Sequence, residues 1–357
     1  MAGRGAQPQP RSRRIRLFAT CVPGLGRMLR RQLDAIDGID VTGTGFDGLS
    51  DIVFFEADRD GRADALASRL GEEFFAEIGR ASRAAGSGAA AVASMAWQPD
   101  AVQRALSVWA DEVRPLAASM TFRVVVRVLS EARFRRADLR RALADLIARD
   151  KPRWRFADPG QLQISITEFH DGQYVTGLRL SDSGTRQHLV SEAERQSGLP
   201  PTLAAAMVEL AGSPGRVGRT LLDPCCGAGT VLSAALAAGW TAEGTDIDAA
   251  AVEAAACNAP GASVQLGDAR ELLLPDDYVA ACVSSLPSAQ FGLPGGWQDW
   301  AEAALAEMSR VTRTGGSVVL LAPELPRPAI PGTLRLRRQV PVRLAGSRST
   351  IWVFRRA

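Results

Sequence analysis

The sequence predicts an α/β protein in which two small α+β units precede an open, doubly wound sheet with helices on both faces. Three observations support this prediction. From residue 201 onward, short apolar strands alternate with alanine-rich helices. Before that point, two stretches each mix strands and helices in α+β order. With 357 residues and 46% hydrophobic content, the chain can bury a sizeable core across two or three domains.

Composition narrows the class of protein. Almost all basic residues are arginine, and the formal net charge is only +3. The five cysteines show no CxxC pairing, which argues against a disulfide scaffold and a zinc site and favours a reducing, cytoplasmic setting. The polar, arginine-containing first residues do not resemble a secretory signal, and no run of 18 apolar residues occurs. We therefore expect a cytoplasmic protein with neither a membrane span nor a bound metal.

The first part of the chain predicts a flexible basic tail and then a small α+β unit. Residues 1–14 are dominated by Gly, Pro, Gln and Arg, which is typical of a solvated tail. Residues 15–79 form the first predicted unit. Its elements are expected in β-α-β-β-α order: a strand at 15–20, a helix at 26–36, strands at 39–43 and 50–56, and a helix at 64–79.

Residues 80–183 predict a second α+β unit with a concentration of positive charge. Residues 84–95 are expected to form a loop or a weak helix; the other elements are helices at 101–113 and 136–149, a strand at 121–129, and a hairpin of 162–168 with 173–180. The basic face is either simply solvated or follows a phosphate backbone. The candidates for RNA contact are Arg123, Arg136, Arg140, Arg141, Lys151 and Arg153.

A linker at residues 184–200 leads into the last domain, residues 201–357. Each element there follows from an apolar run bounded by glycine, proline or polar residues. Strands are expected at 219–222, 242–245, 264–266, 279–285 and 317–322, helices at 203–211, 230–238, 249–257 and 297–311, and two final antiparallel strands at 334–344 and 350–355.

Three predicted strands end in segments that could hold a ligand. A glycine turn at 223–229 follows the first strand, Asp246 follows the second and Asp268 follows the third. The carboxyl ends of parallel strands share one edge, so these segments should meet. An acid about twenty residues beyond a glycine turn suits a ribose diol. The turn contains Gly227 and Gly229 but lacks the third glycine of dinucleotide-binding turns, which favours a smaller nucleoside ligand over NAD.

These residues carry a resemblance to a known family. Residues 223–230, DPCCGAGT, are similar to the DPxCGxGT motif of the THUMP-domain RNA methyltransferases. Residues 18–25, FATCVPGL, resemble the opening of that family's N-terminal ferredoxin-like domain, and residues 80–183 resemble its THUMP domain. The resemblance implies a class I methyltransferase domain with a seven-stranded, mostly parallel, Rossmann-like sheet. It also implies S-adenosyl-L-methionine as cofactor, tRNA or another structured RNA as partner, and methylation of a base amine, guanine N2.

The resemblance also assigns roles to single residues. Gly227 and Gly229 would approach the methionine part of the cofactor, Asp246 would hold its ribose, and Asp268 would accept a hydrogen bond from the adenine amine beside the Ala269 N–H. The remaining candidates for cofactor binding are Asp223, Cys225, Thr230 and Ile247.

The fourth motif departs from the family pattern. The family shows Asn or Asp, then Pro or Leu, Pro, and an aromatic, whereas this chain has Ser285, Leu286, Pro287 and Ser288. A base amine is a weak nucleophile, and two acceptors aim its lone pair at the methyl group. The aromatic stacks on the flipped base. Ser285 and the Leu286 carbonyl still offer oxygens, but Ser288 cannot stack; Phe291, Trp297 or Trp300 either supplies a ring or packs under the following helix.

Two alternatives to a tRNA methyltransferase stay open. The first is an RNA-binding protein that keeps the methyltransferase fold but has weakened or lost catalysis, which the altered fourth motif suggests. The second is a methyltransferase for another RNA or for a small molecule. Salt-independent or absent tRNA binding would favour this second alternative.

Overall fold

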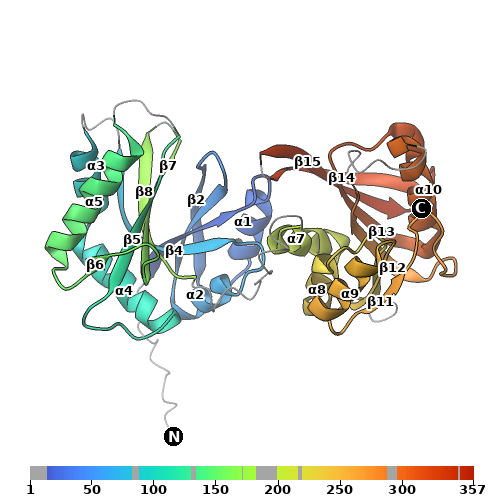
Figure 1. Ribbon diagram of the computed structural model, residues 1–357, viewed down its shortest axis with the longest axis horizontal. Helices are drawn as coiled ribbons and strands as arrows, with labels where there is room; N and C mark the ends of the chain where they lie inside the picture. The colour runs from blue at the N-terminus through green and yellow to red at the C-terminus, as the bar shows by residue number, and fades with distance from the viewer. Residues whose placement is uncertain are drawn as a thin grey trace, which may run out of the picture. The chain divides into compact units, whose positions relative to one another are not determined.

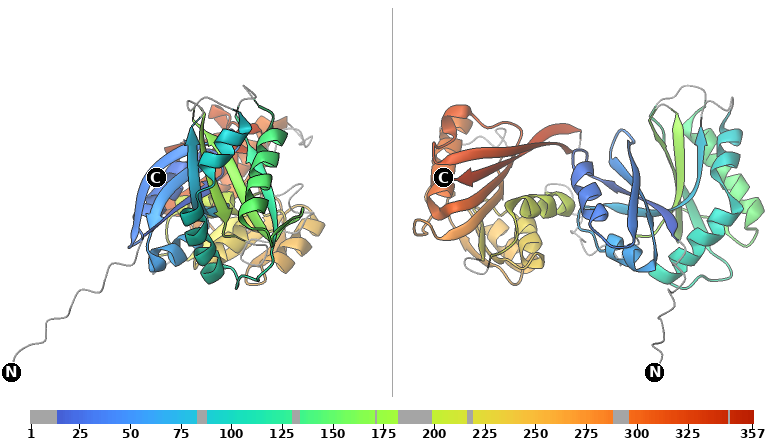
Figure 2. Two further views of the ribbon diagram at one scale, coloured as in Figure 1. Left: turned by 90° about the vertical axis from the view of Figure 1, so that its left-hand side faces the viewer. Right: turned by 180° about the vertical axis from the view of Figure 1, so that it is seen from behind.

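The computed structural model describes residues 14–82, 88–129, 134–170, 172–181, 199–215, 219–287, 296–344 and 346–357. The chain divides into two compact units, each built on one β-sheet (Figures 1 and 2). The N-terminal unit comprises Met1–Cys21 and Gly26–Arg186, and the C-terminal unit comprises Val22–Leu25 and Gln187–Ala357. In the described ranges, no helix is both long enough and apolar enough to cross a membrane.

The N-terminal unit is an eight-stranded sheet with the strand order β2-β3-β1-β4-β8-β7-β5-β6. Its strands are β1 (Ile15–Cys21), β2 (Ile39–Phe46), β3 (Asp51–Ala57), β4 (Glu73–Ser82), β5 (Thr121–Arg127), β6 (Arg155–Phe156), β7 (Leu162–Phe169) and β8 (Gln173–Arg179). Its helices are α1 (Gly26–Asp34), α2 (Arg59–Leu66), α3 (Ala89–Ala96), α4 (Pro99–Glu112) and α5 (Arg136–Asp150).

The prediction of a helix at residues 64–79 is wrong. Helix α2 ends at Leu66, and β4 begins at Glu73 between β1 and β8. Phe74, Phe75 and Ile78 are all buried, since both faces of this central strand are covered. These three positions have the spacing expected for one face of a helix. A strand that is buried on both faces lacks the alternation of apolar and polar residues by which strands are usually recognised. The predicted boundary between residues 79 and 80 falls inside β4, so the two α+β stretches share one sheet.

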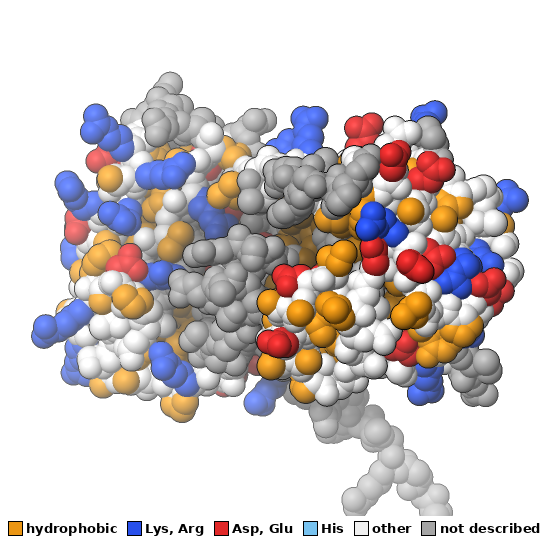
Figure 3. Space-filling view, turned by 45° about the vertical axis from the view of Figure 1, so that its right-hand side comes forward, with side chains coloured by type: hydrophobic (Ala, Val, Ile, Leu, Met, Phe, Trp, Pro, Cys, Tyr) orange, Lys and Arg blue, Asp and Glu red, His pale blue; other side chains and the backbone are white. Residues whose placement is uncertain are grey.

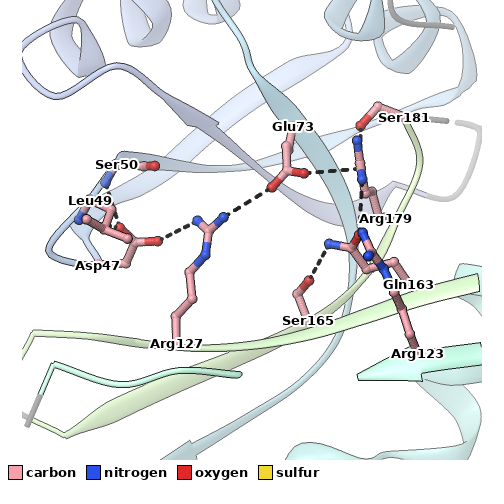
Figure 4. A network of polar contacts seen from close by, with 10 residues as sticks. All are labelled: Asp47, Leu49, Ser50, Glu73, Arg123, Arg127, Gln163, Ser165, Arg179 and Ser181. Carbon is pink, nitrogen blue, oxygen red and sulfur yellow. Dashed lines mark hydrogen bonds and ion pairs between the residues drawn. The ribbon is translucent and has the colours of Figure 1, made fainter. Parts of the chain in front are cut away.

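The two stretches also share an aromatic core and a polar network. Phe18 stacks on Phe75, with ring centroids 4.7 Å apart, and Phe54 packs on Phe169 of β7. Arg127 on β5 bridges Asp47, in the turn after β2, and Glu73 on β4 (Figure 4). The Nη1–Oδ2 distance to Asp47 is 2.9 Å. Strands β2 and β5 lie near opposite ends of the strand order, so this contact requires a strongly curved sheet.

The C-terminal unit is a seven-stranded sheet with the order β11-β10-β9-β12-β13-β15-β14, which confirms the predicted doubly wound, mostly parallel sheet. The five strands β11, β10, β9, β12 and β13 are parallel, and β15 and β14 are antiparallel to their neighbours. The strands are β9 (Thr220–Asp223), β10 (Thr241–Asp246), β11 (Ser263–Leu266), β12 (Val279–Ser285), β13 (Thr312–Ala322), β14 (Leu334–Leu344) and β15 (Ser347–Arg356).

Helices cover both faces of this sheet (Figures 1 and 2). They are α7 (Pro201–Ala211), α8 (Thr230–Ala237), α9 (Ala249–Asn258) and α10 (Gly296–Val311), with a short 3-10 helix, η3 (Arg327–Ala329). Helix α10 packs through Trp300, Leu305 and Met308 onto the face that carries Cys282 and Phe354. Neighbouring residues along these strands, such as Leu221 and Leu222, are both buried, as expected for parallel strands covered on two sides.

Candidate active site

The carboxyl end of β9 places a buried carboxyl at the centre of the site. Asp223 is 1% exposed, and its Oδ1 accepts hydrogen bonds from Ser284 Oγ at 2.6 Å and from the Cys225 backbone N–H at 3.2 Å. Burial raises the pKa of Asp223 to about 7, although the hydrogen bonds from Ser284 and Cys225 lower it. Ser284 belongs to β12, so Asp223 joins the first motif to the strand that carries the fourth motif.

Two glycines shape the turn between β9 and α8. Gly227 and Gly229 have φ values of +50° and +85°, the left-handed region that other residues rarely adopt. A Cβ on Gly229 would lie 3.0 Å from Ala255 Cα, whereas a Cβ on Gly227 would meet no atom within 4 Å. Gly229 is also the N-cap of α8, whose first helical residue is Thr230. The open side of Gly227 therefore faces space that a ligand can fill.

Asp246 at the end of β10 organises this turn. Its Oδ2 accepts a 2.8 Å hydrogen bond from the Gly227 backbone N–H, and its Oδ1 accepts one from Asp248 N–H at 3.0 Å. Each carboxylate oxygen can accept two hydrogen bonds, so each retains one acceptor direction within these contacts. That pair of acceptors matches a ribose diol. The next residue, Ile247, is 70% exposed and offers an apolar surface beside it.

Asp268, which follows β11, already has partners. Arg270 donates to both carboxylate oxygens, with Nη2 2.6 Å from Oδ2 and Nε 3.0 Å from Oδ1, and its backbone N–H also reaches Oδ1. The hydrogen bonds from Arg270 lower the pKa of Asp268. Oδ1 of Asp268 therefore already accepts two hydrogen bonds from Arg270, and an adenine amine would share Oδ2 with the Arg270 guanidinium. Ala269 is buried.

The fourth motif lies at the end of β12, beside β9. Ser285 and Pro287 are half-buried, and Leu286 is buried with its backbone N–H donating to Leu321 O at 3.0 Å. Ser288, like Phe291, lies outside the described residues. Trp297 and Trp300 stack on each other, with centroids 5.6 Å apart, and Trp300 is buried in the core. Both rings belong to the first turns of α10 itself and pack against the core of the C-terminal unit.

Sequence reasoning missed Ser284 and Arg270. Ser284 is the polar residue before Ser285 in an otherwise apolar strand, and only the neighbouring strand shows that it binds Asp223. The contact of Arg270 with Asp268 could have been predicted from the local sequence, because a side chain two residues after an aspartate in a tight turn can fold back onto that carboxylate. Burial raises the pKa of the Cys225 and Cys226 thiols, which disfavours the thiolate form that a cysteine nucleophile needs.

The six basic residues predicted to contact RNA lie in the N-terminal unit; Figure 3 shows blue side chains spread over the surfaces of both units. Arg136, Arg140 and Arg153 are exposed and form no ion pair within the described ranges. Arg141 lines a groove of about 450 Å³ between α3 and α5. Arg123 and Lys151 have partners: Arg123 Nε donates to Gln163 Oε1 at 3.1 Å, and Lys151 Nζ lies 3.3 Å from Asp150.

Comparison with known proteins supports the assignment of the C-terminal unit as a methyltransferase domain. Residues 221–316 match the family model described as a methyltransferase domain. The structure of TrmN from Thermus thermophilus is similar, with a TM-score of 0.73 and 22% identity over 96% of this chain and 100% of that chain. The structure of SMU.472 complexed with SAH is also similar, with a TM-score of 0.65 and 13% identity over 96% and 98%.

The family match covers the turn after β9, all of β10 and the end of β12, which are the segments that form the site. The C-terminal unit therefore has the Rossmann-like fold of class I methyltransferases.

Proposed function

We propose that this protein methylates an exocyclic base amine of tRNA, guanine N2, with S-adenosyl-L-methionine as the methyl donor. One observation carries the proposal: Gly227, Asp246 and Ser285 lie at the ends of the adjacent strands β9, β10 and β12. The resemblance of residues 223–230 to the THUMP-domain RNA methyltransferases adds the substrate class. The likeness to TrmN over nearly the whole chain is consistent with it, because that likeness includes the N-terminal unit.

The residues present fit the cofactor. Open space beside Gly227, two acceptor directions on Asp246 and the exposed Ile247 side chain together suit an amino-acid tail, a ribose diol and a flat base. When bound, the cofactor supplies a methyl group activated by its sulfonium. The backbone N–H of Gly227 holds Asp246 in place, so the ribose acceptors are oriented before the ligand arrives.

The base amine would be oriented by residues at the end of β12. The Ser285 hydroxyl and the Leu286 carbonyl would accept the two amine hydrogens and direct the nitrogen lone pair toward the methyl carbon. Bound in this site, the cofactor would supply the methyl carbon and its sulfur would depart as a thioether, and the amine held by Ser285 and Leu286 would release one proton to water. Serine is shorter than the Asn or Asp of the family and carries no charge. We therefore expect slow methyl transfer.

Tritiated cofactor and bulk unmodified tRNA test this proposal. The expected result is incorporation of tritium into tRNA and N2-methylguanosine in its nucleoside digest by mass spectrometry. Cofactor binding is measured in the same preparation by calorimetry. Measurable cofactor binding without any incorporation would overturn the proposal, and a different methylated nucleoside would overturn its base atom.

The altered fourth motif favours a second candidate, an RNA-binding protein that retains the cofactor site without catalysis. The double variant Ser285→Asn with Ser288→Phe restores the family pattern and separates the two. If the wild-type chain is silent and the double variant methylates tRNA, the second candidate is supported. If the wild-type chain is active, that candidate is excluded.

A further inference from the structure

The last two strands carry a concentration of arginine that the candidate active site does not use. Residues 334–357 contain seven arginines and no acidic residue, a formal charge of +7 in a chain whose total is +3. The rest of the chain is therefore net acidic. The arginines of the β14–β15 hairpin are Arg335, Arg337, Arg338, Arg343, Arg348, Arg355 and Arg356.

The register of the hairpin places arginines directly opposite one another. Arg343 on β14 faces Arg348 on β15, and Arg335 faces Arg355. Like charges at facing positions of an antiparallel pair weaken the pairing. The fold alone therefore gives no reason for these residues, and two such pairs in one hairpin indicate a requirement other than stability.

Acidic neighbours compensate only part of this charge. Asp277 forms an ion pair with Arg356, and Glu209 on α7 lies close enough to Arg338 for that charge to lower its pKa, against the larger raising effect of burial. In contrast, Arg343 and Arg348 are exposed, and their side chains form no ion pair or hydrogen bond within the described part of the chain. The outer pair is therefore available to an external anion.

Protection of the sheet edge does not explain the pattern. Strand β14 is an edge strand, and such strands often carry charges or proline against unwanted pairing. Pro341 already removes one backbone donor from this edge. Strand β15 is an inner strand, bonded to β13 and β14, and needs no such protection. Arginine on β15 therefore calls for another reason.

We propose that the β14–β15 hairpin is a phosphate-binding surface for the RNA substrate, with Arg343 and Arg348 as its outer pair. The identity of the polyanion rests on the proposed function. Guanidinium groups present a planar set of donors that matches phosphate oxygens, and two facing arginines can hold one or two neighbouring phosphates. RNA binding then involves both units of the chain, and not only the arginines of the N-terminal unit.

The test compares Arg343→Gln/Arg348→Gln with the control Arg31→Gln/Arg59→Gln, which removes the same charge from exposed positions on α1 and α2. Binding of bulk unmodified tRNA is followed by fluorescence anisotropy between 50 and 200 mM salt. Each lost phosphate contact should weaken binding about 5-fold near 0.1 M salt and reduce the salt slope by about 0.7 to 0.9. The hairpin variant should therefore lose about 25-fold in affinity, and the control less than about 2-fold.

Thermal unfolding of the same variants separates binding from folding. Removing facing like charges should leave the melting temperature unchanged or raise it. An unchanged tRNA affinity and salt slope would overturn the inference, as would a control that loses as much affinity as the hairpin variant. Methyl transfer is measured separately. If the hairpin variant loses tRNA binding and the wild-type chain methylates nothing, the proposed function is wrong and this inference stands. If the hairpin variant is fully active and binds tRNA with unchanged affinity, this inference is wrong and the proposed function stands.

Discussion

The backbone N–H of Gly227 donates a 2.8 Å hydrogen bond to Oδ2 of Asp246, which joins the turn after β9 to the end of β10. The two residues are predicted to contact different parts of the cofactor. Their bond means that the site for the amino-acid tail and the site for the ribose are held as one unit. A change at either residue should therefore alter both the conformation of the turn and the affinity for the cofactor.

Replacement of Asp246 by alanine should weaken cofactor binding strongly. The variant loses two acceptors for the ribose diol and the bond to Gly227, and hydrogen bonds to charged groups contribute about 1.5–3 kcal/mol each. We expect the Kd for S-adenosyl-L-homocysteine to rise about 100-fold by calorimetry. The matched control is Asp248→Ala, which removes the cap of α9 and costs about 1 kcal/mol of stability. A similar Kd for both variants would contradict the assigned role of Asp246.

The two glycines of the turn should respond differently to alanine. Gly229→Ala places a Cβ 3.0 Å from the Ala255 backbone at a φ of +85°, so it should lower the melting temperature markedly. Gly227→Ala meets open space, and its cost should stay near the 1–2 kcal/mol of an unfavourable φ. Its Cβ would instead occupy cofactor space and reduce cofactor affinity. Equal stability losses, or unchanged cofactor affinity in Gly227→Ala, would refute this division.

Asp223 should make the stability of the C-terminal unit depend on pH. Its pKa is about 7 in the folded protein and near 3.8 in an unfolded chain. Below about pH 4 both states hold the proton; as the pH rises to about 7, the unfolded state loses it first, so the free energy of unfolding falls. Asp223→Asn should remove this decline, on the order of 4 kcal/mol at most. Denaturant titrations from pH 4.5 to 8 measure it, with Asp248→Asn as the exposed control. A difference between variant and wild type that stays constant with pH would exclude the raised pKa.

The Arg127–Asp47 pair should stabilise the N-terminal unit far more than an exposed pair does. The Asp47 side chain is fully buried, and among the described residues Arg127→Ala leaves it with the Leu49 and Ser50 backbone donors alone. We expect a loss of about 3 kcal/mol. Arg30→Ala, which breaks the exposed pair with Asp34, should cost less than about 1 kcal/mol. Urea unfolding followed by the fluorescence of Trp109 and Trp154 would show the difference, and equal losses would count against the buried network.

The sequence was a good guide where one local pattern determines one element. The parallel strands of the C-terminal unit and the helices after them were predicted within a few residues, because each short apolar run is bounded by glycine, proline or polar residues. It failed at β4, where Phe74, Phe75 and Ile78 have helical spacing but lie in a strand that is buried on both faces. The two-residue strand β6 was also missed, since two residues carry no periodic pattern.

The sequence predicted which strand ends form the candidate site, because these positions follow from the order of the strands. Asp246 was predicted to face the glycine turn, and it bonds directly to Gly227. The partners of Asp223 and Asp268 were not predicted, because Ser284 is 61 residues from Asp223 and Arg270 depends on a local turn. Such contacts depend on tertiary placement and side-chain rotamers, which hydrophobic periodicity does not report.

Strand β4 also limits how this chain can change through recombination. It bonds to β1 on one side and to β8 on the other, so it belongs to both α+β stretches. A break at residue 80 would leave residues 73–79 paired with β1 but would separate them from β8, so that β4 and β8 would have unpaired edges, which favour aggregation. Both α+β stretches therefore depend on one shared sheet, whereas the C-terminal unit has a complete sheet of its own.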